Sequence, residues 1–288
     1  MCDRILRCLP IECSNSKHPR IFLVLAVFSL FLLAICLPNS IAETINSQAA
    51  VIMNASTGEI LFAKNSDYLL LPASTAKLMT AIVVMEKANL SDVVTISQKA
   101  AHAHPFKAGF KKGDKVTIEG LLFAALMKSG NDAAVALAEA VAGSEESFVS
   151  LMNEKAALIG ALNTRFINAT GLPGVGQYIT ALDLSKIMKY AMGYSKLKEI
   201  LATPSAEVST EKGKAIFLKN TDKLLWSDEQ IIGGKTGYTN SAKHCFVFAA
   251  ERDGKTIIVS LLGSPTRRNM WKEAKRLADK GFQMVVSH

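Results

Sequence analysis

The sequence predicts an α+β protein, with one antiparallel sheet flanked by helices and a second, mostly helical lobe. Segments with strand character lie at both ends of the region after residue 43, and segments with helical character lie between them. The simplest arrangement joins the two groups of strands into one sheet and packs helices on it. A chain of 288 residues, 49% of them hydrophobic, is large enough to bury such a core.

The first strands and the first helix are expected between residues 49 and 88. Two apolar runs, 49–53 and 59–63, flank a polar turn that ends at Gly58, which is typical of a β-hairpin. Pro72 then interrupts extended structure. From Ser74 to about residue 88 the apolar side chains recur at helical spacing, so we expect an amphipathic helix that begins at Ser74.

The middle of the chain has helical character, and its last third returns to strands. We expect helices over residues 117–128, 131–142, 146–161 and 181–192, with a loop over 163–178. Strands are expected over residues 231–236, 244–250 and 256–262, and a last helix over 270–279. A cleft between the sheet and the helical lobe is the expected place for a functional site.

Residues 1–42 have the composition of a signal peptide. Basic residues precede an apolar run at 21–37, and Ser40 and Ala42 satisfy the small-residue rule for signal peptidase, which predicts cleavage after Ala42. The run is at the lower limit for spanning a bilayer, so an uncleaved anchor is the alternative. We expect an exported protein, periplasmic or extracytoplasmic and associated with the cell envelope, that touches the membrane only if this segment is retained.

The region after the leader has a mild positive charge and one cysteine. The whole chain carries a formal charge of +8, of which about +6 remains after residue 42. Its basic residues are not interleaved with aromatic ones, which argues against nucleic-acid binding. Cys245 lies in an apolar stretch and is expected in the core. His102 and His104 have no ligand-rich companion segment, so the sequence indicates no metal site and no cofactor.

Ser74 and Lys77 form the first of three short motifs that carry chemistry. Ser-x-x-Lys occurs four times in the chain, but only Ser74 follows a proline and opens a long amphipathic helix. One helical turn separates the two side chains, so they share a face, and a hydroxyl beside an amine can act as a nucleophile. Taken alone, a helix-capping serine beside a surface lysine explains this motif equally well.

The other two motifs are Ser129-Gly130-Asn131 and Lys235-Thr236-Gly237. The first adds a hydroxyl and an amide at a turn between two helices, where such residues also occur simply as turn formers. The second ends an apolar strand, and the missing side chain of Gly237 would let a substrate backbone approach. In this order the three motifs supply the parts of serine acyl transfer without a histidine.

On these motifs the chain resembles the low-molecular-weight penicillin-binding proteins, the D-alanyl-D-alanine carboxypeptidases of peptidase family S11. The resemblance covers nearly all of the region after the leader and includes residues 71–80, 129–133, 168–173 and 235–239. It implies a β-lactamase/transpeptidase-like fold and a catalytic domain over residues 43–288, without the β-rich C-terminal domain of many relatives. It also implies peptidoglycan stem peptides as substrate and β-lactam antibiotics as covalent inhibitors.

The resemblance implies a catalytic role for three side chains. Ser74 would attack the carbonyl between two D-alanines and form an acyl-enzyme. Lys77 would take its proton as a neutral amine, and both burial and the charge of Lys235 would lower its pKa. Ser129 would relay a proton to the leaving D-alanine.

The resemblance also implies the residues that bind substrate. Asn131 would hold Lys77 and the substrate amide, while Lys235 and Thr236 would bind the terminal carboxylate. The strand that contains Gly237 would pair with the stem peptide. Backbone N–H groups of Ser74 and Tyr238 would form the oxyanion hole.

The chain departs from its relatives at two positions. Tyr238 stands where many relatives have histidine, and Thr221 stands where some have an arginine. Binding of the carboxylate would then depend more on Lys235, with Arg267 or Arg268 as a candidate second cation.

Three alternatives remain open from the sequence. One is an endopeptidase that cuts D-alanyl cross-links, and another is a catalytically idle wall-binding module. The third is a serine β-lactamase. Class A β-lactamases use a glutamate in a mid-chain loop for deacylation, and no glutamate occurs between Glu154 and Glu199. The sequence therefore predicts slow deacylation of penicillin.

Overall fold

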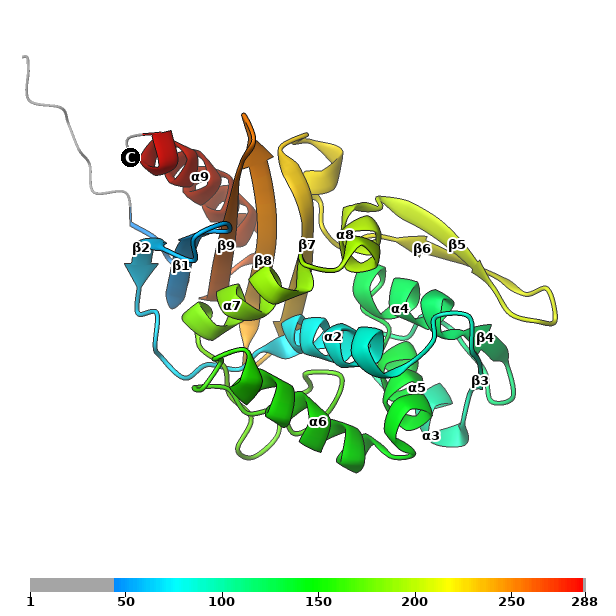
Figure 1. Cartoon of the computed structure of the whole chain (residues 1–288). Helices are drawn as coiled ribbons and strands as arrows, with labels where there is room; N and C mark the ends of the chain where they lie inside the picture. Colours follow the sequence, from blue (N-terminus) through cyan, green and yellow to red (C-terminus); the bar gives the residue numbers. More distant parts are fainter. Residues whose placement is uncertain (1–43, 287–288) are drawn as a thin grey trace, which may run out of the picture. The chain divides into compact units, whose positions relative to one another are not determined.

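The centre of the computed structural model, which describes residues 44–286, is a five-stranded antiparallel sheet. Its strands are β1 (Ala49–Asn54), β2 (Ile60–Lys64), β7 (Ile231–Thr239), β8 (Lys243–Arg252) and β9 (Lys255–Ser264). Their order is β2-β1-β9-β8-β7, so β1 from one end of the sequence pairs with β9 from the other, with Val51 opposite Ser260. The predicted sheet is confirmed, and β7 is one of its two edge strands (Figure 1).

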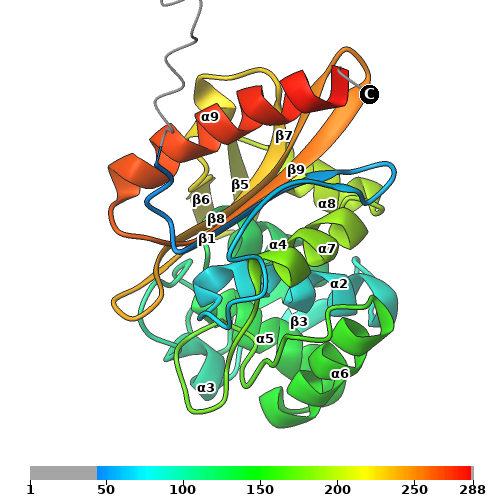
Figure 2. The same ribbon diagram turned by 90° about the vertical axis from the view of Figure 1, so that its left-hand side faces the viewer.

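Both faces of the sheet are buried at β1, β8 and β9, and alternate side chains along each of these strands belong to different hydrophobic cores. In β1, Ala50 and Ile52 face the C-terminal helix α9 (Arg267–Val286), whereas Val51 and Met53 face the helical side. Figure 2 shows the sheet nearly edge-on between α9 and the other helices. Because neither face of β1, β8 and β9 meets water, the central residues of these strands are mostly apolar instead of alternating with polar residues.

The helical side is organised around α2 (Lys77–Lys87), whose residues 77–84 are all buried. Around it lie α4 (Ile118–Met127), α5 (Asn131–Ala142), α6 (Glu145–Leu158) and α7 (Ala181–Ala191). Helix α7 also packs on β1, β8 and β9, so it connects the helices to the sheet. The side chains of Thr117, Ser144 and Thr180 accept hydrogen bonds from backbone N–H groups of α4, α6 and α7, which fixes where these helices begin.

Short elements complete the described part of the chain. They are two hairpins, β3 (Val93–Thr95) with β4 (Lys115–Thr117) and β5 (Ser205–Ser209) with β6 (Ala215–Lys219), the helices α3 (Gln98–Ala101) and α8 (Ser195–Ala202), and the 3₁₀ turns η1 (Ala73–Ala76) and η2 (Leu224–Trp226). Helix α8 packs on β7, and η1 packs on both β7 and β8. These contacts bring elements from distant parts of the sequence to the edge strand.

Several predicted boundaries differ from the structure, and two of these differences have a clear physical cause. Ser74 lies in η1 instead of the first turn of the α-helix, because Ala73 adopts a left-handed φ of 46° and the chain turns tightly before α2 begins at Lys77. Helix α9 spans Arg267–Val286, about twice the predicted length, since its exposed face is strongly polar while Met270, Ala274 and Phe282 maintain an apolar stripe. The α+β architecture itself is confirmed.

None of the described helices is both long enough and apolar enough to cross a membrane. The predicted signal peptide, with its cleavage site after Ala42, lies outside the described residues.

Candidate active site

Ser74 and Lys77 meet where η1 passes into α2. The Lys77 Nζ lies 3.1 Å from the Ser74 Oγ, 2.7 Å from the Oδ1 of Asn131 and 2.8 Å from the carbonyl oxygen of Thr170. The Lys77 side chain is fully buried. These contacts come from three segments far apart in the sequence, and they point the amine at the serine hydroxyl.

The environment of Lys77 favours a neutral amine. Burial removes the water that would solvate an ammonium ion, and the positive charge of Lys235 acts in the same direction, so the pKa of Lys77 lies well below its usual value. The carboxylate of Asp132 opposes this shift but does not reverse it. A neutral lysine beside a serine hydroxyl can accept the hydroxyl proton and so activate the nucleophile.

Ser129 and Lys235 form a second pair across the site from Ser74. The Lys235 Nζ donates to the Ser129 Oγ at 3.1 Å and to the carbonyl oxygen of Thr236 at 2.9 Å. Ser129 adopts a left-handed φ of 62° just before α5 begins, which turns its backbone sharply at the start of that helix. Burial lowers the pKa of the Lys235 amine to about 7, although the carboxylate of Asp222 acts to raise it.

Asp222 is a buried acid that the sequence analysis did not assign to the site. Its Oδ1 accepts the backbone N–H of Leu224 at 2.9 Å, while its Oδ2 has no hydrogen-bond partner within the described residues. Burial raises the pKa of this carboxyl to about 7. Asp222 and Lys235 therefore each change charge close to neutral pH, in the same buried region.

Asn131 and Asp132 anchor the segment that precedes α4 to the first turn of α5. Asn131 donates through its side chain to the carbonyl oxygen of Pro105 and through its backbone N–H to that of Phe106, the latter at 2.8 Å. The Asp132 carboxylate accepts the N–H groups of Ala108, at 2.7 Å, and Gly109, at 2.8 Å. Asn131 thus contacts both Lys77 and this segment.

Gly237 is required for the approach of β7 to the Ser74 turn. A Cβ atom at Gly237 would lie 2.9 Å from the backbone nitrogen of Ser74 and 3.0 Å from the Cβ of Ala73. We expected this glycine to make room for a substrate backbone, but the chain segment that comes close is the protein's own nucleophile turn. A larger residue at position 237 would therefore push Ser74 away from the edge strand.

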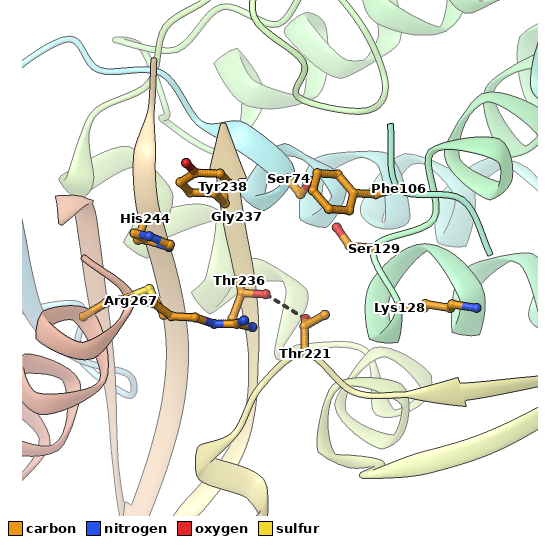
Figure 3. Close-up of a pocket in the computed structure, with 11 residues that line it drawn as sticks. Ser74, Phe106, Lys128, Ser129, Thr221, Thr236, Gly237, Tyr238, His244 and Arg267 are labelled. Atoms are coloured by element: carbon orange, nitrogen blue, oxygen red, sulfur yellow. Dashed lines mark hydrogen bonds between the residues drawn. The ribbon is translucent and has the colours of Figure 1, made fainter. Parts of the chain in front are cut away.

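A cavity of about 310 Å³ opens beside these residues (Figure 3). Its lining residues are Ser74, Phe106, Lys128, Ser129, Thr221, Thr236, Gly237, Tyr238, His244, Arg267 and Met270. Lys77, Asn131 and Lys235 lie buried behind this surface. The cavity thus presents hydroxyl groups, and the amines that control them are shielded from solvent.

The structure brings together the residues of the three motifs, either at the cavity wall or directly behind it. Arg267 lines the cavity, whereas Arg268 is not among its lining residues. Thr221, one of the two positions at which we expected the chain to depart from its relatives, accepts a hydrogen bond of 2.7 Å from the Thr236 hydroxyl. Phe106 and Asp222 carried no sequence signal, because neither belongs to a motif and both depend on the folded chain for their position.

Comparison with known proteins identifies the family. The family model for D-alanyl-D-alanine carboxypeptidases, peptidase S11, matches residues 38–266. The chain belongs to this family.

Cys245, by contrast with the motif residues, is buried in the core as expected, and burial raises the pKa of its thiol to about 12.

Individual S11 relatives agree with this assignment. The chain is 33% identical to D-alanyl-D-alanine carboxypeptidase DacF of Bacillus subtilis, over 84% of this chain and 64% of that protein. It is 34% identical to DacB2 of Mycobacterium tuberculosis, over 83% of each. The crystal structure of the Streptomyces K15 DD-transpeptidase matches with a TM-score of 0.79 and 35% identity, over 83% of this chain and 98% of that one. The chain thus spans about two thirds of the Bacillus relative and most of the other two.

Proposed function

We propose that this protein is a serine-type D-alanyl-D-alanine carboxypeptidase that removes the terminal D-alanine from stem pentapeptides of peptidoglycan. The observation that carries the proposal is the buried Lys77 amine, with a lowered pKa and its Nζ 3.1 Å from the Ser74 Oγ, beside an open cavity. A neutral amine in contact with a serine hydroxyl is the arrangement that acyl transfer without histidine requires.

In the proposed first step, Lys77 takes the proton of Ser74 as its Oγ bonds to the carbonyl carbon between the two D-alanines. The developing oxyanion is held by the backbone N–H groups of Ser74 and Tyr238. The close approach of Gly237 to the Ser74 backbone nitrogen supports this pairing, because it places the two N–H groups on adjoining segments. The stem peptide extends along β7, whose outer edge is not paired with another strand of the sheet.

The acyl-enzyme forms when the C–N bond to the last D-alanine breaks. Ser129 passes its hydroxyl proton to the departing nitrogen, so the leaving group departs as a neutral amine. Ser129 then receives from Lys77 the proton that Lys77 had removed from Ser74. Lys235 donates to the Ser129 Oγ, which keeps the hydroxyl proton of Ser129 free to point at substrate. Water then attacks the ester carbonyl with Lys77 as base and regenerates Ser74.

We assign the terminal carboxylate of the substrate to the end of the cavity that contains Thr236 (Figure 3). The hydroxyl groups of Thr236 and Thr221 lie 2.7 Å apart there, and the exposed Arg267 guanidinium reaches the same region. Lys235 is buried behind them and contributes its charge and the ordering of Ser129 and Thr236. Arg267 is thus the stronger of the two arginine candidates.

A β-lactam would acylate Ser74 by the same route and remain bound. The side-chain hydrogen bonds found for Lys77 and Ser74 within the described residues go to one another, to Asn131 and to the carbonyl oxygen of Thr170, and none goes to a carboxylate. Activation of a deacylating water by a glutamate, as in class A β-lactamases, therefore has no support.

The deciding experiment is labelling with a fluorescent penicillin, followed by mass mapping of the modified peptide. We expect one label on Ser74, release of D-alanine from a pentapeptide substrate, and loss of both in Ser74→Ala. Ser195→Ala is the matched control, because Ser195 begins another Ser-x-x-Lys motif on the exposed side of α8 and should not matter. Rapid turnover of the penicillin, or labelling that survives in Ser74→Ala, would contradict the proposal.

The substrate that acylates Ser74, and whether water or an amine then attacks the acyl-enzyme, distinguish a carboxypeptidase from an endopeptidase and a transpeptidase. One similar protein is named a DD-transpeptidase and another, from Pseudomonas aeruginosa, a D-alanyl-D-alanine endopeptidase. We expect hydrolysis of the linear pentapeptide to exceed both cleavage of a cross-linked dimer and transfer to an added amine acceptor. Product analysis by mass spectrometry with all three substrates tests this order.

We also propose that the protein is exported and acts at the cell envelope, with residues 1–42 as its signal peptide. The support is the basic, then apolar, then small-residue order of that segment. The mass of the protein recovered from an envelope fraction would test it: loss of residues 1–42 is expected, and an intact N-terminus would favour the anchor.

A further inference from the structure

Phe106 is an exposed aromatic residue on the wall of the active-site cavity. It leaves 61% of its surface in contact with solvent, although a phenylalanine gains free energy when it is buried. It also adopts a left-handed φ of 60°, a conformation that costs free energy for any residue with a Cβ. A strained and exposed phenylalanine at a ligand cavity suggests that its position serves a ligand.

The backbone on both sides of Phe106 is fixed to the catalytic segment. Its carbonyl oxygen accepts the N–H of Asn131 at 2.8 Å, and the preceding carbonyl accepts the Asn131 side chain. On the other side, Lys128 donates to the carbonyl oxygen of Ala108 at 3.0 Å, and Asp132 accepts the Ala108 N–H at 2.7 Å. Phe106 is therefore held rigidly relative to Ser129 and Asn131.

The ring of Phe106 lies beside Ser74 and Ser129 in the cavity (Figure 3). Tyr238 lies on the opposite, β7 side of Ser74, and its ring stacks on His244 with centroids 4.4 Å apart. Thr236, Thr221 and Arg267 lie toward the other end of the cavity. Ser74 therefore lies between two aromatic side chains at one end of the cavity, and polar side chains line the other end.

We infer that Phe106 determines specificity by packing against the substituent on the acyl side of the scissile bond, and that it favours donors with an extended apolar or aromatic group there. This inference rests on the proposed function, which sends the leaving carboxylate to the Thr236 end. The acyl side must then lie toward Phe106 and Tyr238. In a stem peptide that substituent is the residue before the two D-alanines, and in a penicillin it is the acylamino side chain.

Two penicillins that share one reactive ring provide the test. Benzylpenicillin has an aromatic acylamino group, and 6-aminopenicillanic acid has none. We expect Phe106→Ala to lower the second-order rate constant for acylation of Ser74 by benzylpenicillin about five- to tenfold, which corresponds to the loss of one aromatic contact. The rate constant with 6-aminopenicillanic acid should fall less than about twofold, because this compound has no group for Phe106 to contact. Phe106→Leu should retain an intermediate preference.

Phe217→Ala is the matched control, because Phe217 is similarly exposed, at 64%, but lies on β6 and does not line the cavity. It should change neither rate. Thermal denaturation of each variant checks folding, and both phenylalanine substitutions should leave the midpoint nearly unchanged. The same comparison with an acylated lysyl-D-alanyl-D-alanine and acetyl-D-alanyl-D-alanine should give the same selective loss.

Two results would overturn the inference while leaving the proposed function intact. One is an equal loss with both penicillins, which would mean that Phe106 only supports Ser129, and the other is no loss with either. Failure of the wild-type protein to be labelled at Ser74 by either compound would instead overturn the proposed function and this inference together.

Discussion

Asp222 and Lys235 are two buried groups of opposite charge that titrate in the same pH range. Burial raises the pKa of the Asp222 carboxyl to about 7 and lowers that of the Lys235 amine to about 7. Each charge partly stabilises the other. Lys77 must be neutral to accept a proton, and the charge of Lys235 helps to keep it so. The residues of this site therefore act through one another's charge as well as through contact.

The substitution Asp222→Asn should move the pH profile of acylation. Because the Asp222 carboxylate raises the pKa of Lys235, its removal lets Lys235 lose its proton at lower pH. The acylation rate should rise with pH as Lys77 becomes neutral, and it should fall at higher pH as Lys235 loses its proton and its charge. We therefore expect this descending limb of the profile to shift to lower pH in the variant. Penicillin acylation rates between pH 5 and 9 measure this, and an unchanged descending limb would contradict it.

The same substitution should have a pH-dependent effect on stability. The folded-state pKa of Asp222 lies above its unfolded value, so its contribution to stability is complete below about pH 4 and is lost as the pH rises to about 7. The amide introduced by Asp222→Asn does not titrate. The variant should therefore match the wild type at pH 5 more closely than at pH 8, where it should be the more stable protein. Urea denaturation at both pH values measures the difference.

At the scale of elements, the 3₁₀ turn η1 is held between β7 and the loop that follows α6. Gly237 allows the strand to contact one side of the turn, and Gly171 allows the loop to contact the other. A Cβ atom at Gly171 would overlap the carbonyl oxygen of Ala73. The position of Ser74 is thus set by backbone contacts on two sides.

Gly171→Ala should displace η1 and separate Ser74 from Lys77. We expect loss of penicillin acylation and a destabilisation of about 3 kcal/mol or more, because both strain and overlap must be relieved. Gly143→Ala is the matched control: Gly143 has a similar φ of 75°, but nothing lies within 4 Å of the place that a Cβ atom would take there. It should cost only about 1 kcal/mol and leave acylation unchanged. Equal effects of the two substitutions would show that backbone strain alone matters.

The elements that the sequence predicted well are those whose apolar pattern is continuous. Strands β1, β8 and β9 are apolar on both faces, and α5 was predicted with its observed limits. The short pair β3–β4 was missed because three residues give no usable periodicity. The start of α2 was misplaced because the tight turn at Ser74 depends on Gly171 and Gly237, which are distant in sequence.

The candidate site was predictable in its residues but not in its arrangement. The three motifs named Ser74, Lys77, Ser129, Asn131 and Lys235, and all of them converge. Spacing could not reveal that Lys235 lies behind Ser129, outside the cavity lining. Nor could it reveal Phe106, whose role follows from a strained backbone and a cavity that exist only after folding.

At the scale of the whole described unit, the segment that leads into β1 is tied to the C-terminal helix. Glu273 is almost fully buried in α9, and its carboxylate accepts the backbone N–H groups of Asn46 and Ser47 and the Ser47 hydroxyl. Together with the pairing of β1 and β9, this contact joins the two ends of the described chain.

Glu273→Gln should weaken that connection without touching the active site. A neutral amide can replace only part of the acceptor capacity of the buried carboxylate, so we expect a destabilisation of about 2 kcal/mol and a lower urea midpoint. The rate of penicillin acylation in the folded protein should stay the same. Glu229→Gln, at an exposed position, is the control and should leave the midpoint unchanged. A midpoint equal to the wild type in Glu273→Gln would contradict the prediction.

The dependence of Ser74 on β7 has a consequence for protein synthesis. The ribosome makes the nucleophile and Lys77 early, but the strand that supplies Lys235 and Gly237 is among the last segments to be made. Until that strand is in place, the fold that buries Lys77 is incomplete and the charge of Lys235 is absent, so both causes that lower the pKa of the amine are weakened. The Ser74 turn also lacks its contact with β7. In a nascent or prematurely terminated chain, Ser74 is therefore not activated as a nucleophile, and we expect penicillin not to acylate it.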